Sequence, residues 1–240
     1  MRKWLESKDQ VTQKEYCVNL LKSRKSRKDL KYIPTQVELR SLISPTWVFL
    51  NKIFTDFEIV CQNLGFERRF SNNADFTNTN ISKIFVDSRE QSPLIFDKNI
   101  ETFVVGLKYG DYAATDVSPS IVIERKSLND FCGTLSSRNI DRFHREIEKA
   151  AAANSYIVVI VETDLSKSLS FNYLPHMKNV KASPDFIFGN VRDTIQKYKN
   201  IQFLFADGRK EASRLTIKLL SNQNAAQNHD LQYLYDCNKL

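Results

Sequence analysis

Hydrophobic and polar residues follow two different patterns along the 240-residue chain, and the change falls near residue 80. Beyond that point, short runs rich in Val, Ile and Phe alternate with longer segments of helical periodicity. Short β-branched and aromatic runs of this kind are typical of strands. We therefore expect strands at residues 83–87 (KIFVD), 102–107 (TFVVGL), 112–117, 121–126, 156–162 (YIVVIVE) and 201–206 (IQFLFA).

Three segments between or after these strands have the apolar spacing of helices. In the first, Phe143 and Ile147 recur on one stripe. The second opens with Ser183 and Pro184, an N-cap residue followed by proline at the first helical position. Strands that alternate with helices predict an α/β fold with a mixed sheet flanked by helices. The predicted helices span residues 139–153, 183–199 and 209–220.

The part of the chain before residue 70 has a different character. Its apolar residues recur at mixed spacings of three and four, with turn signals at Pro34, Pro45 and Gly65, and this pattern predicts about three short helices. The Asn-, Ser- and Thr-rich stretch SNNADFTNTN that follows is typical of a linker. The expected organisation is a small all-helical module, a linker, an α/β domain and a C-terminal tail, at residues 1–70, 71–81, 82–222 and 223–240.

The charge of the chain indicates what kind of partner it binds. A content of 42% hydrophobic and 26% charged residues is ordinary for a folded protein, but the formal net charge is +7, which favours polyanionic partners. Residues 1–80 carry 14 Lys and Arg against 9 Asp and Glu. A run of basic residues is usually no more than a solvent-exposed helix face. We expect phosphate contacts from the densest run, which comprises Lys22, Arg24, Lys25, Arg27, Lys28 and Lys31.

Cysteine usage and hydropathy argue against three other classes. The four cysteines form no CxxC pair and the three histidines are scattered, so a zinc site is not expected. The first residues lack the apolar run of a signal peptide, and the longest strongly apolar run, residues 156–161, is too short to span a bilayer. We expect an intracellular protein without membrane contact, cytoplasmic or nucleoid-associated, and a phage or mobile-element origin is compatible with this.

Candidate chemistry lies in residues 110–130, GDYAATDVSPSIVIERKSLND, where an apolar strand ends in three consecutive charges. Alternation along that strand places Glu124 and Lys126 on one face and Arg125 on the other. Two roles stay open for Arg125: it can brace a neighbouring carboxylate, or reach a phosphate from the strand end.

The preceding strand should bring another carboxylate to this end of the hairpin. A turn at Ser118-Pro119 makes the numbers of opposed residues sum to roughly 237 or 238. Asp111 then lies close to Lys126 and within diagonal reach of Glu124. Two neighbouring carboxylates repel each other unless a cation lies between them, and such hard oxygen ligands suit magnesium or manganese.

Phosphodiester hydrolysis matches this set of side chains. The reaction uses a metal ion to polarise a phosphoryl oxygen and to lower the pKa of a bound water, together with a positive group that stabilises charge or positions the water. Asp111 and Glu124 are the candidate metal ligands, and Lys126 is the candidate positive group.

The same residues resemble the GDXnERKX3D signature of the XPF-type, or ERCC4-type, nucleases, a branch of the restriction-endonuclease-like PD-(D/E)xK superfamily. Gly110-Asp111 is followed by twelve residues, then Glu124-Arg125-Lys126, three residues and Asp130. Flanking segments resemble this family as well: VDSRE at 86–90, LSSR at 135–138 and YIVVIVE at 156–162. The resemblance covers roughly residues 82–220.

Several expectations follow from the resemblance. It implies a restriction-endonuclease-like fold, dependence on Mg²⁺ or Mn²⁺, and cleavage of branched or junction DNA. It implies that Asp87 and Glu90 join the metal ligands, and that Arg138 contacts DNA. Glu162 either completes the metal shell or caps a neighbouring segment, and Asp130 braces the helix that follows it. The catalytic set is then Asp111, Glu124, Arg125, Lys126 and Asp87.

The family also motivates pairing of the nuclease domain with a second copy of itself. A helical apolar stripe in the second predicted helix offers a surface for such a homodimer, although the protein's own core is the alternative place for it. The stripe consists of Ile187, Val191, Ile195 and Tyr198.

DNA binding is expected to come from the N-terminal module. Repair nucleases of this family usually carry a C-terminal tandem helix-hairpin-helix module with glycine-rich hairpins, whereas only Gly208 lies in the corresponding region here. Residues 34–40 (PTQVELR) and 44–66 (SPTWVFLNKIFTDFEIVCQNLGF) resemble a small helical repeat found beside homing and phage endonucleases. The usual Phe-Gly-Ser-Trp core of that repeat reads Ile-Phe-Thr-Asp-Phe at residues 53–57.

We therefore expect a metal-dependent DNA endonuclease that acts on branched or junction DNA. One alternative is a homing-type endonuclease that recognises a long duplex sequence, as the N-terminal module suggests. Another is a DNA-binding partner subunit that has lost activity, and the intact Asp111, Glu124 and Lys126 argue against it.

Overall fold

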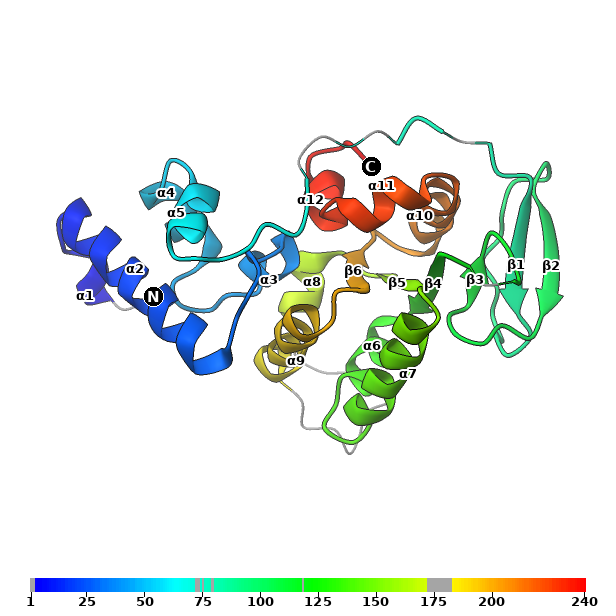
Figure 1. Ribbon diagram of the computed structural model, residues 1–240, viewed down its shortest axis with the longest axis horizontal. Helices are drawn as coiled ribbons and strands as arrows, with labels where there is room; N and C mark the ends of the chain where they lie inside the picture. Colours follow the sequence, from blue (N-terminus) through cyan, green and yellow to red (C-terminus); the bar gives the residue numbers. More distant parts are fainter. Residues whose placement is uncertain (1–2, 72–73, 75, 79, 118, 172–182) are drawn as a thin grey trace. The chain divides into compact units, whose positions relative to one another are not determined.

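The computed structural model describes residues 3–71, 74, 76–78, 80–117, 119–171 and 183–240. The chain divides into two compact units, Met1–Phe70 and Ser71–Leu240. The first is all-helical and the second is a mixed sheet flanked by helices (Figure 1). The fold class predicted from the hydrophobic pattern is therefore confirmed.

Short, well-capped helices build the first unit. Asp9, Thr46 and Asp56 each accept a hydrogen bond from a backbone N–H in the first turn of the helix that they precede, and Thr35 forms a reciprocal capping box with Glu38. A single cluster of apolar side chains, centred on the fully buried side chains of α2, α4 and α5, closes the unit. The helices are α1 (Lys3–Glu6), α2 (Gln10–Lys28), α3 (Gln36–Arg40), α4 (Trp47–Ile53) and α5 (Phe57–Asn63).

Six strands in the described residues form the sheet of the second unit: β1 (Lys83–Asp87), β2 (Glu101–Val105), β3 (Tyr112–Ala113), β4 (Ile121–Lys126), β5 (Tyr156–Val161) and β6 (Ile201–Phe205). Their order is β2-β1-β3-β4-β5-β6. The β1–β2, β4–β5 and β5–β6 pairs are parallel, whereas β3 is antiparallel to both of its neighbours. All six residues of β5 are buried, as expected for a parallel strand covered on both faces.

Helices cover both faces of this sheet (Figure 1). On one face, α10 and the two helices after it pack their apolar residues against alternate side chains of the strands. On the other face, Phe131, Phe188, Phe203 and Phe205 form a cluster of aromatic contacts. The helices are α6 (Leu128–Thr134), α7 (Ile140–Ala152), α8 (Leu165–Leu169), α9 (Pro184–Lys197), α10 (Arg209–Ser221), α11 (Gln223–Asn228) and α12 (Leu231–Asp236).

The end of the chain is part of this core, which corrects the expectation of a tail at 223–240. Gln202 on β6 donates to the carbonyls of Ala226 and His229 and accepts from the Leu231 N–H. Gln232 on α12 accepts from the backbone N–H of Phe205. Two buried amides thus bind α11 and α12 to the edge of the sheet. The expected linker also contributes to the core, since Phe76 is 6% exposed.

The strand after Asp111 is shorter than expected. It ends at Ala113 rather than Val117, and the Thr115 hydroxyl accepts a hydrogen bond from the Val117 N–H in the connection to β4. Such local bonds compete with strand pairing. The connection is longer than the tight turn expected at Ser118-Pro119, of which Ser118 lies outside the described residues.

The apolar stripe of α9 faces the core of its own unit. Ile187 and Val191 are fully buried, Ile195 is 2% exposed and Tyr198 is 8% exposed. This stripe therefore gives no support to a homodimer. Among the helices that the structure describes, none combines the length and the apolar composition needed to cross a membrane.

Candidate active site

Asp111 and Glu124 face each other where β3 and β4 meet. Tyr112 pairs with Ile123, so the next opposed positions toward the strand end are Asp111 and Glu124. Opposed residue numbers thus sum to 235 rather than to roughly 237 or 238, because the connection is centred about one residue earlier than the turn expected at Ser118-Pro119. The sequence-based expectation placed Asp111 close to Lys126 and within diagonal reach of Glu124; continuing the observed register by one pair places Asp111 opposite Glu124.

Glycine is required immediately before Asp111. Gly110 has a φ of +71°, and a Cβ at this position would lie 2.8 Å from the Cβ of Val122. Neither the backbone conformation nor the space suits another residue. This close approach lets the Asp111 N–H donate to the Ile123 carbonyl at 2.7 Å. The glycine of the motif therefore sets the position of its aspartate.

The Asp111 carboxylate is held by the backbone of β4. Its Oδ2 accepts a hydrogen bond from the Arg125 N–H at 2.7 Å. Burial and the nearby charge of Glu124 raise the pKa of Asp111 to about 7, because both disfavour the ionised form. On the facing strand, Lys126 Nζ lies 2.7 Å from Glu124 Oε1. One carboxylate thus has a cation beside it, and the other lacks a direct cationic partner among the described residues.

Asp87, at the end of β1, is next to Asp111 and is 2% exposed. Its N–H donates to the Asp111 carbonyl, which joins the end of β1 to the start of β3. Its carboxylate accepts three hydrogen bonds from Arg89, through the backbone N–H, Nε and Nη2 at 2.7, 2.8 and 2.6 Å. These hydrogen bonds hold the pKa of Asp87 below its usual value. Sequence reasoning assigned no role to Arg89, although its spacing of two residues from Asp87 is a local signal.

Four alternating charges run beside the two carboxylates, and we call Glu90, Arg125, Glu162 and Arg209 the charge chain. Arg125 Nε and Nη2 donate to the two oxygens of Glu90 at 3.0 Å each. Arg125 Nη1 lies 3.2 Å from Glu162 Oε2. Arg209 Nη1 lies 3.1 Å from Glu162 Oε1. The sequence left two roles open for Arg125. In the structure its guanidinium braces neighbouring carboxylates, those of Glu90 and Glu162.

Two members of the charge chain, Glu90 and Arg125, are stabilised in their ionised forms. Burial alone would lower the pKa of Arg125, but the hydrogen bond to Glu90 and the charge of Glu162 raise it above the ordinary arginine value. Burial likewise opposes ionisation of Glu90, yet the bonds from Arg125 and the Ser92 N–H keep its pKa below the usual range. Glu162 therefore serves as a partner for two arginines. The sequence left its role open.

Divalent cations suit the pair formed by Asp111 and Glu124. In the described parts of the chain, no group of three or more His, Cys, Asp and Glu side chains forms a preassembled metal site. Two facing carboxylates, one of which is difficult to ionise without added positive charge, have the hard oxygen chemistry that Mg²⁺ and Mn²⁺ prefer. Asp87 and Glu90, which the resemblance also assigned to the metal, instead bind Arg89 and Arg125.

The last residue of the signature, Asp130, and Arg138 beyond it have different surroundings. Asp130 braces α6, because its carboxylate accepts from the Ser127 hydroxyl while Ser127 accepts from the Asp130 N–H. Arg138 is exposed in the turn between α6 and α7, where it makes no ion pair with another described residue. It is available for contact with an anion.

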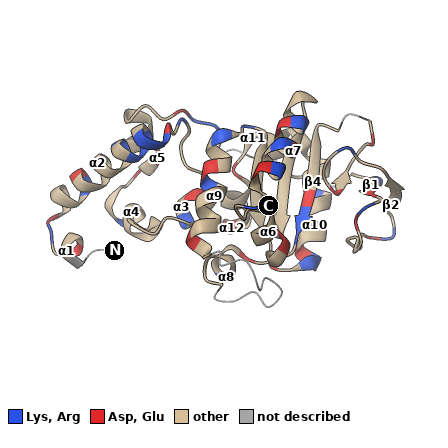
Figure 2. Ribbon diagram, turned by 90° about the horizontal axis from the view of Figure 1, so that it is seen from below, with Lys and Arg blue, Asp and Glu red and all other residues tan. Residues whose placement is uncertain are grey.

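The basic residues of α2, drawn in blue in Figure 2, differ in their surroundings. Arg24, Arg27 and Lys28 have the spacing of one helix face, and burial together with the charge of Arg27 lowers the pKa of Arg24. Lys25 instead donates to the Gly65 carbonyl at 2.8 Å and lies over the Phe66 ring. It holds the module together, so its expected contact with phosphate has a competing intramolecular partner.

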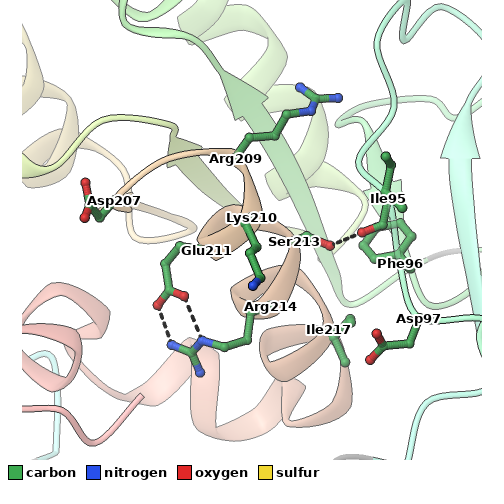
Figure 3. A pocket seen from close by; sticks show the side chains of 10 residues that line it. All are labelled: Ile95, Phe96, Asp97, Asp207, Arg209, Lys210, Glu211, Ser213, Arg214 and Ile217. Atoms are coloured by element: carbon green, nitrogen blue, oxygen red, sulfur yellow. Dashed lines mark hydrogen bonds and ion pairs between the residues drawn. The ribbon is translucent and has the colours of Figure 1, made fainter.

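A pocket of about 910 Å³ adjoins the charge chain (Figure 3). Ile95, Phe96 and Asp97 line one side, and α10 lines the other. Arg209 belongs to both features: its guanidinium extends away from the Glu211–Arg214 pair toward the strands. No sequence signal marked Arg209, which lies 47 residues from Glu162.

Comparison with known proteins gives one family and several structures. The sequence model described as the ERCC4 domain matches residues 86–219. A structure of XPF from Aeropyrum pernix in complex with DNA has a TM-score of 0.43 and 21% identity, over 60% of this chain and 64% of that chain. Another structure of XPF from this organism has a TM-score of 0.44 and 20% identity, over 65% and 69%. The chain thus spans less than two thirds of the first structure's length. No curated protein matches it.

Proposed function

The chain belongs to the ERCC4 domain family, whose match at residues 86–219 spans more than half of its length, and from this premise we propose that it is a metal-dependent DNA endonuclease. One observation carries the proposal. Inside the matched segment, Asp111 and Glu124 face each other at the end of a hairpin, and the ammonium group of Lys126 lies beside them. This arrangement supports hydrolysis of phosphodiester bonds.

Asp111 and Glu124 would hold a Mg²⁺ or Mn²⁺ ion. When bound, such an ion polarises a phosphoryl oxygen and lowers the pKa of a coordinated water. The Arg125 N–H keeps the Asp111 carboxylate oriented toward Glu124, and Gly110 lets the two strands approach closely enough for this. The proposed ligand set is thus smaller than the four carboxylates expected from the sequence, since Asp87 and Glu90 hold arginines.

Lys126 is the proposed charge-stabilising residue. Its ammonium group carries a positive charge next to Glu124, and the side chain is only 12% exposed, so solvent screens the charge weakly. A phosphate oxygen that approaches the two carboxylates would meet this charge. Arg125, although part of the same motif, is engaged by Glu90 and Glu162, and we assign it to holding the site together.

Phosphate contacts outside the active site are proposed for two regions. In the helical unit, Arg27, Lys28 and Lys31 are exposed near the end of α2. Arg138 is exposed in the α/β unit. Contacts of this kind add affinity without sequence information. Resemblance alone motivates branched or junction DNA as the substrate.

Cleavage of a DNA panel tests the proposal. The full chain is incubated with Mg²⁺ and with duplex, flap, fork and four-way-junction DNA of matched length, and Lys126→Ala serves as the inactive control. We expect cutting of a branched substrate that EDTA abolishes. Site-specific cutting of long duplexes would instead support the homing-type alternative. Binding without cutting by the wild-type protein would overturn the proposal in favour of an inactive partner subunit.

A further inference from the structure

The charge chain closes into a ring that is linked to a proposed metal ligand through the backbone N–H of Arg125. At one end, Arg209 Nη2 donates to the carbonyls of Ser92 and Pro93, and the Pro93 contact measures 2.6 Å. At the other end, Glu90 accepts a hydrogen bond from the Ser92 N–H at 2.8 Å. The connections run from Glu90 through Arg125 and Glu162 to Arg209, and from there back to Glu90.

We propose that Glu162 and Arg209 are positioning residues that fix Arg125 and, through its backbone N–H, the Asp111 carboxylate. Arg125 is the only member of the ring that touches Asp111 in the described residues, through the 2.7 Å bond to Oδ2. The first residue of α10 thereby sets the geometry of a site that lies on β3 and β4. The inference rests on the proposed function, since it specifies how the same two carboxylates are held.

Burial explains why both residues are needed. The Arg125 and Glu162 side chains are 12% and 13% exposed, and the Glu90 side chain is 6% exposed. A buried charge that loses one partner is strongly destabilised, because neither water nor another group replaces the lost interaction. Removal of Arg209 would leave Glu162 with one arginine, and Arg125 would relax toward the unbalanced carboxylate.

The ring also connects two segments that carry site residues. Ser92 and Pro93 follow the turn that contains Asp87 and Arg89, whereas Arg125 belongs to β4. The Leu94 N–H donates to the hydroxyl of Tyr112, the residue next to Asp111. Arg209 thus holds the segment after β1 against the sheet. Loss of its guanidinium should loosen this segment together with β4.

The same helix offers a matched control. Arg214 lies five residues after Arg209, and its guanidinium binds Glu211 at 2.9 and 2.6 Å, away from the ring (Figure 3). Arg209→Gln and Arg214→Gln therefore remove the same group from the same helix, and only the first opens the ring. Arg209→Lys is the conservative variant: it keeps the charge near Glu162 but cannot also reach the two carbonyls.

Nuclear magnetic resonance of the full-length protein without metal or DNA tests the coupling directly. The readouts are the backbone N–H signal of Arg125, which reports its bond to Asp111, and the Nε–H signal, which reports its bond to Glu90. We expect Arg209→Gln and Glu162→Gln to shift or broaden both signals, Arg209→Lys to do so less, and Arg214→Gln to leave them in place. Unchanged Arg125 signals in a folded Arg209→Gln protein would overturn the proposal.

Metal binding gives a second readout that does not need cleavage. The affinity of Mn²⁺, measured by electron paramagnetic resonance, should fall about tenfold in Arg209→Gln, the usual loss when a residue that orients a ligand is removed. Arg209→Lys should recover part of this loss, and Arg214→Gln should bind as the wild type does. Equal affinities in Arg209→Gln and Arg214→Gln would contradict the inference.

Cleavage separates this inference from the proposed function. In a wild-type protein that cuts, Arg209→Gln should lower kcat by about tenfold with little change in the Kd for DNA. Normal kcat in this variant, with an inactive Lys126→Ala control, would refute the positioning role and leave the nuclease assignment intact. If the wild-type protein does not cut, the nuclease assignment fails, while the resonance and Mn²⁺ results still decide the positioning role.

Discussion

The two units of this protein use positive charge in opposite ways. In the α/β unit, Arg125 and Lys126 are 12% exposed and each binds a carboxylate at a fixed position. In the helical unit, Arg27 and Lys28 are exposed on α2. Buried charges in fixed geometry can act on developing charge in a reaction, whereas exposed charges supply long-range attraction that salt screens. Under the proposed function, the α/β unit supplies the chemistry and the helical unit supplies affinity for DNA.

Among the variants that test this comparison, active-site substitutions should have the largest effect, and the effect should be on the cleavage rate. Asp111→Asn, Glu124→Gln and Lys126→Ala should each reduce the cleavage rate at least about a hundredfold, because each removes a metal ligand or the adjacent positive charge. The Kd for DNA should change little. Single-turnover cleavage and a binding titration in Ca²⁺ measure the two quantities separately.

A carboxylate on the surface is the control for these variants. Glu146→Gln removes a side chain that is 47% exposed on α7 and that, among the described residues, pairs only with Arg142, so cleavage should stay at the wild-type rate. Full activity in any two of the three active-site variants would disprove the assignment. A uniform loss that includes Glu146→Gln would indicate a general effect of negative charge instead.

Substitutions at and just after the end of α2 should have the second-largest effect and the opposite pattern. Arg27→Gln, Lys28→Gln and Lys31→Gln combined should weaken DNA binding and leave the rate at saturating DNA unchanged. If all three side chains touch duplex phosphates, the slope of log affinity against log salt becomes shallower by about 2.7, at about 0.9 per contact. Titrations at several salt concentrations measure this slope.

Lys25 sharpens this test, because it lies on the same helix and binds inside the module. Lys25→Gln should lower the melting temperature through loss of the contacts with Gly65 and Phe66, and it should leave the salt slope nearly unchanged. A triple variant with the wild-type slope would show that the end of α2 does not bind DNA and would leave the catalytic assignment in place.

The order of elements could be predicted because each strand has a local pattern. All six strands were expected from β-branched and aromatic runs, and the motif residues Asp111, Glu124 and Lys126 were expected together because a hairpin brings its own ends together. The pairing register was predicted wrongly, since it depends on where the connection after Ala113 is centred, and no residue type marks that position. Helices α11 and α12, with six residues each, are too short for a periodic pattern.

The partners of the charged residues could not be predicted for a related reason. Arg209 meets Glu162 only because the parallel crossover after β5 places the start of α10 at the end of that strand. Lys25 meets Gly65 across a separation of 40 residues. A lysine or an arginine can either be exposed to solvent or bind a partner within the protein. Only the tertiary fold determines which of the two occurs.

The smallest effect expected is the pH dependence of stability, and it links the Asp111 pKa to the metal. Because the folded protein raises this pKa from 3.8 to about 7, ionisation of Asp111 opposes folding. This destabilisation is absent below the unfolded value of 3.8, grows as the pH rises toward 7, and is complete above about 7. Mg²⁺ between the two carboxylates should offset it, so stabilisation by Mg²⁺ should increase from about pH 5 to about pH 8.

Melting temperatures with and without Mg²⁺ measure this effect. A cation at ten times its Kd adds about 1.4 kcal/mol, or roughly 3 to 6 °C for a protein of this size. We expect that increase near pH 8, a smaller one near pH 5, and none at either pH in Asp111→Asn, whose side chain carries no charge. The basic residues at the end of α2 provide the contrast: their triple variant should respond to Mg²⁺ as the wild type does. A Mg²⁺ effect that is independent of pH, or that persists in Asp111→Asn, would show that the cation binds elsewhere.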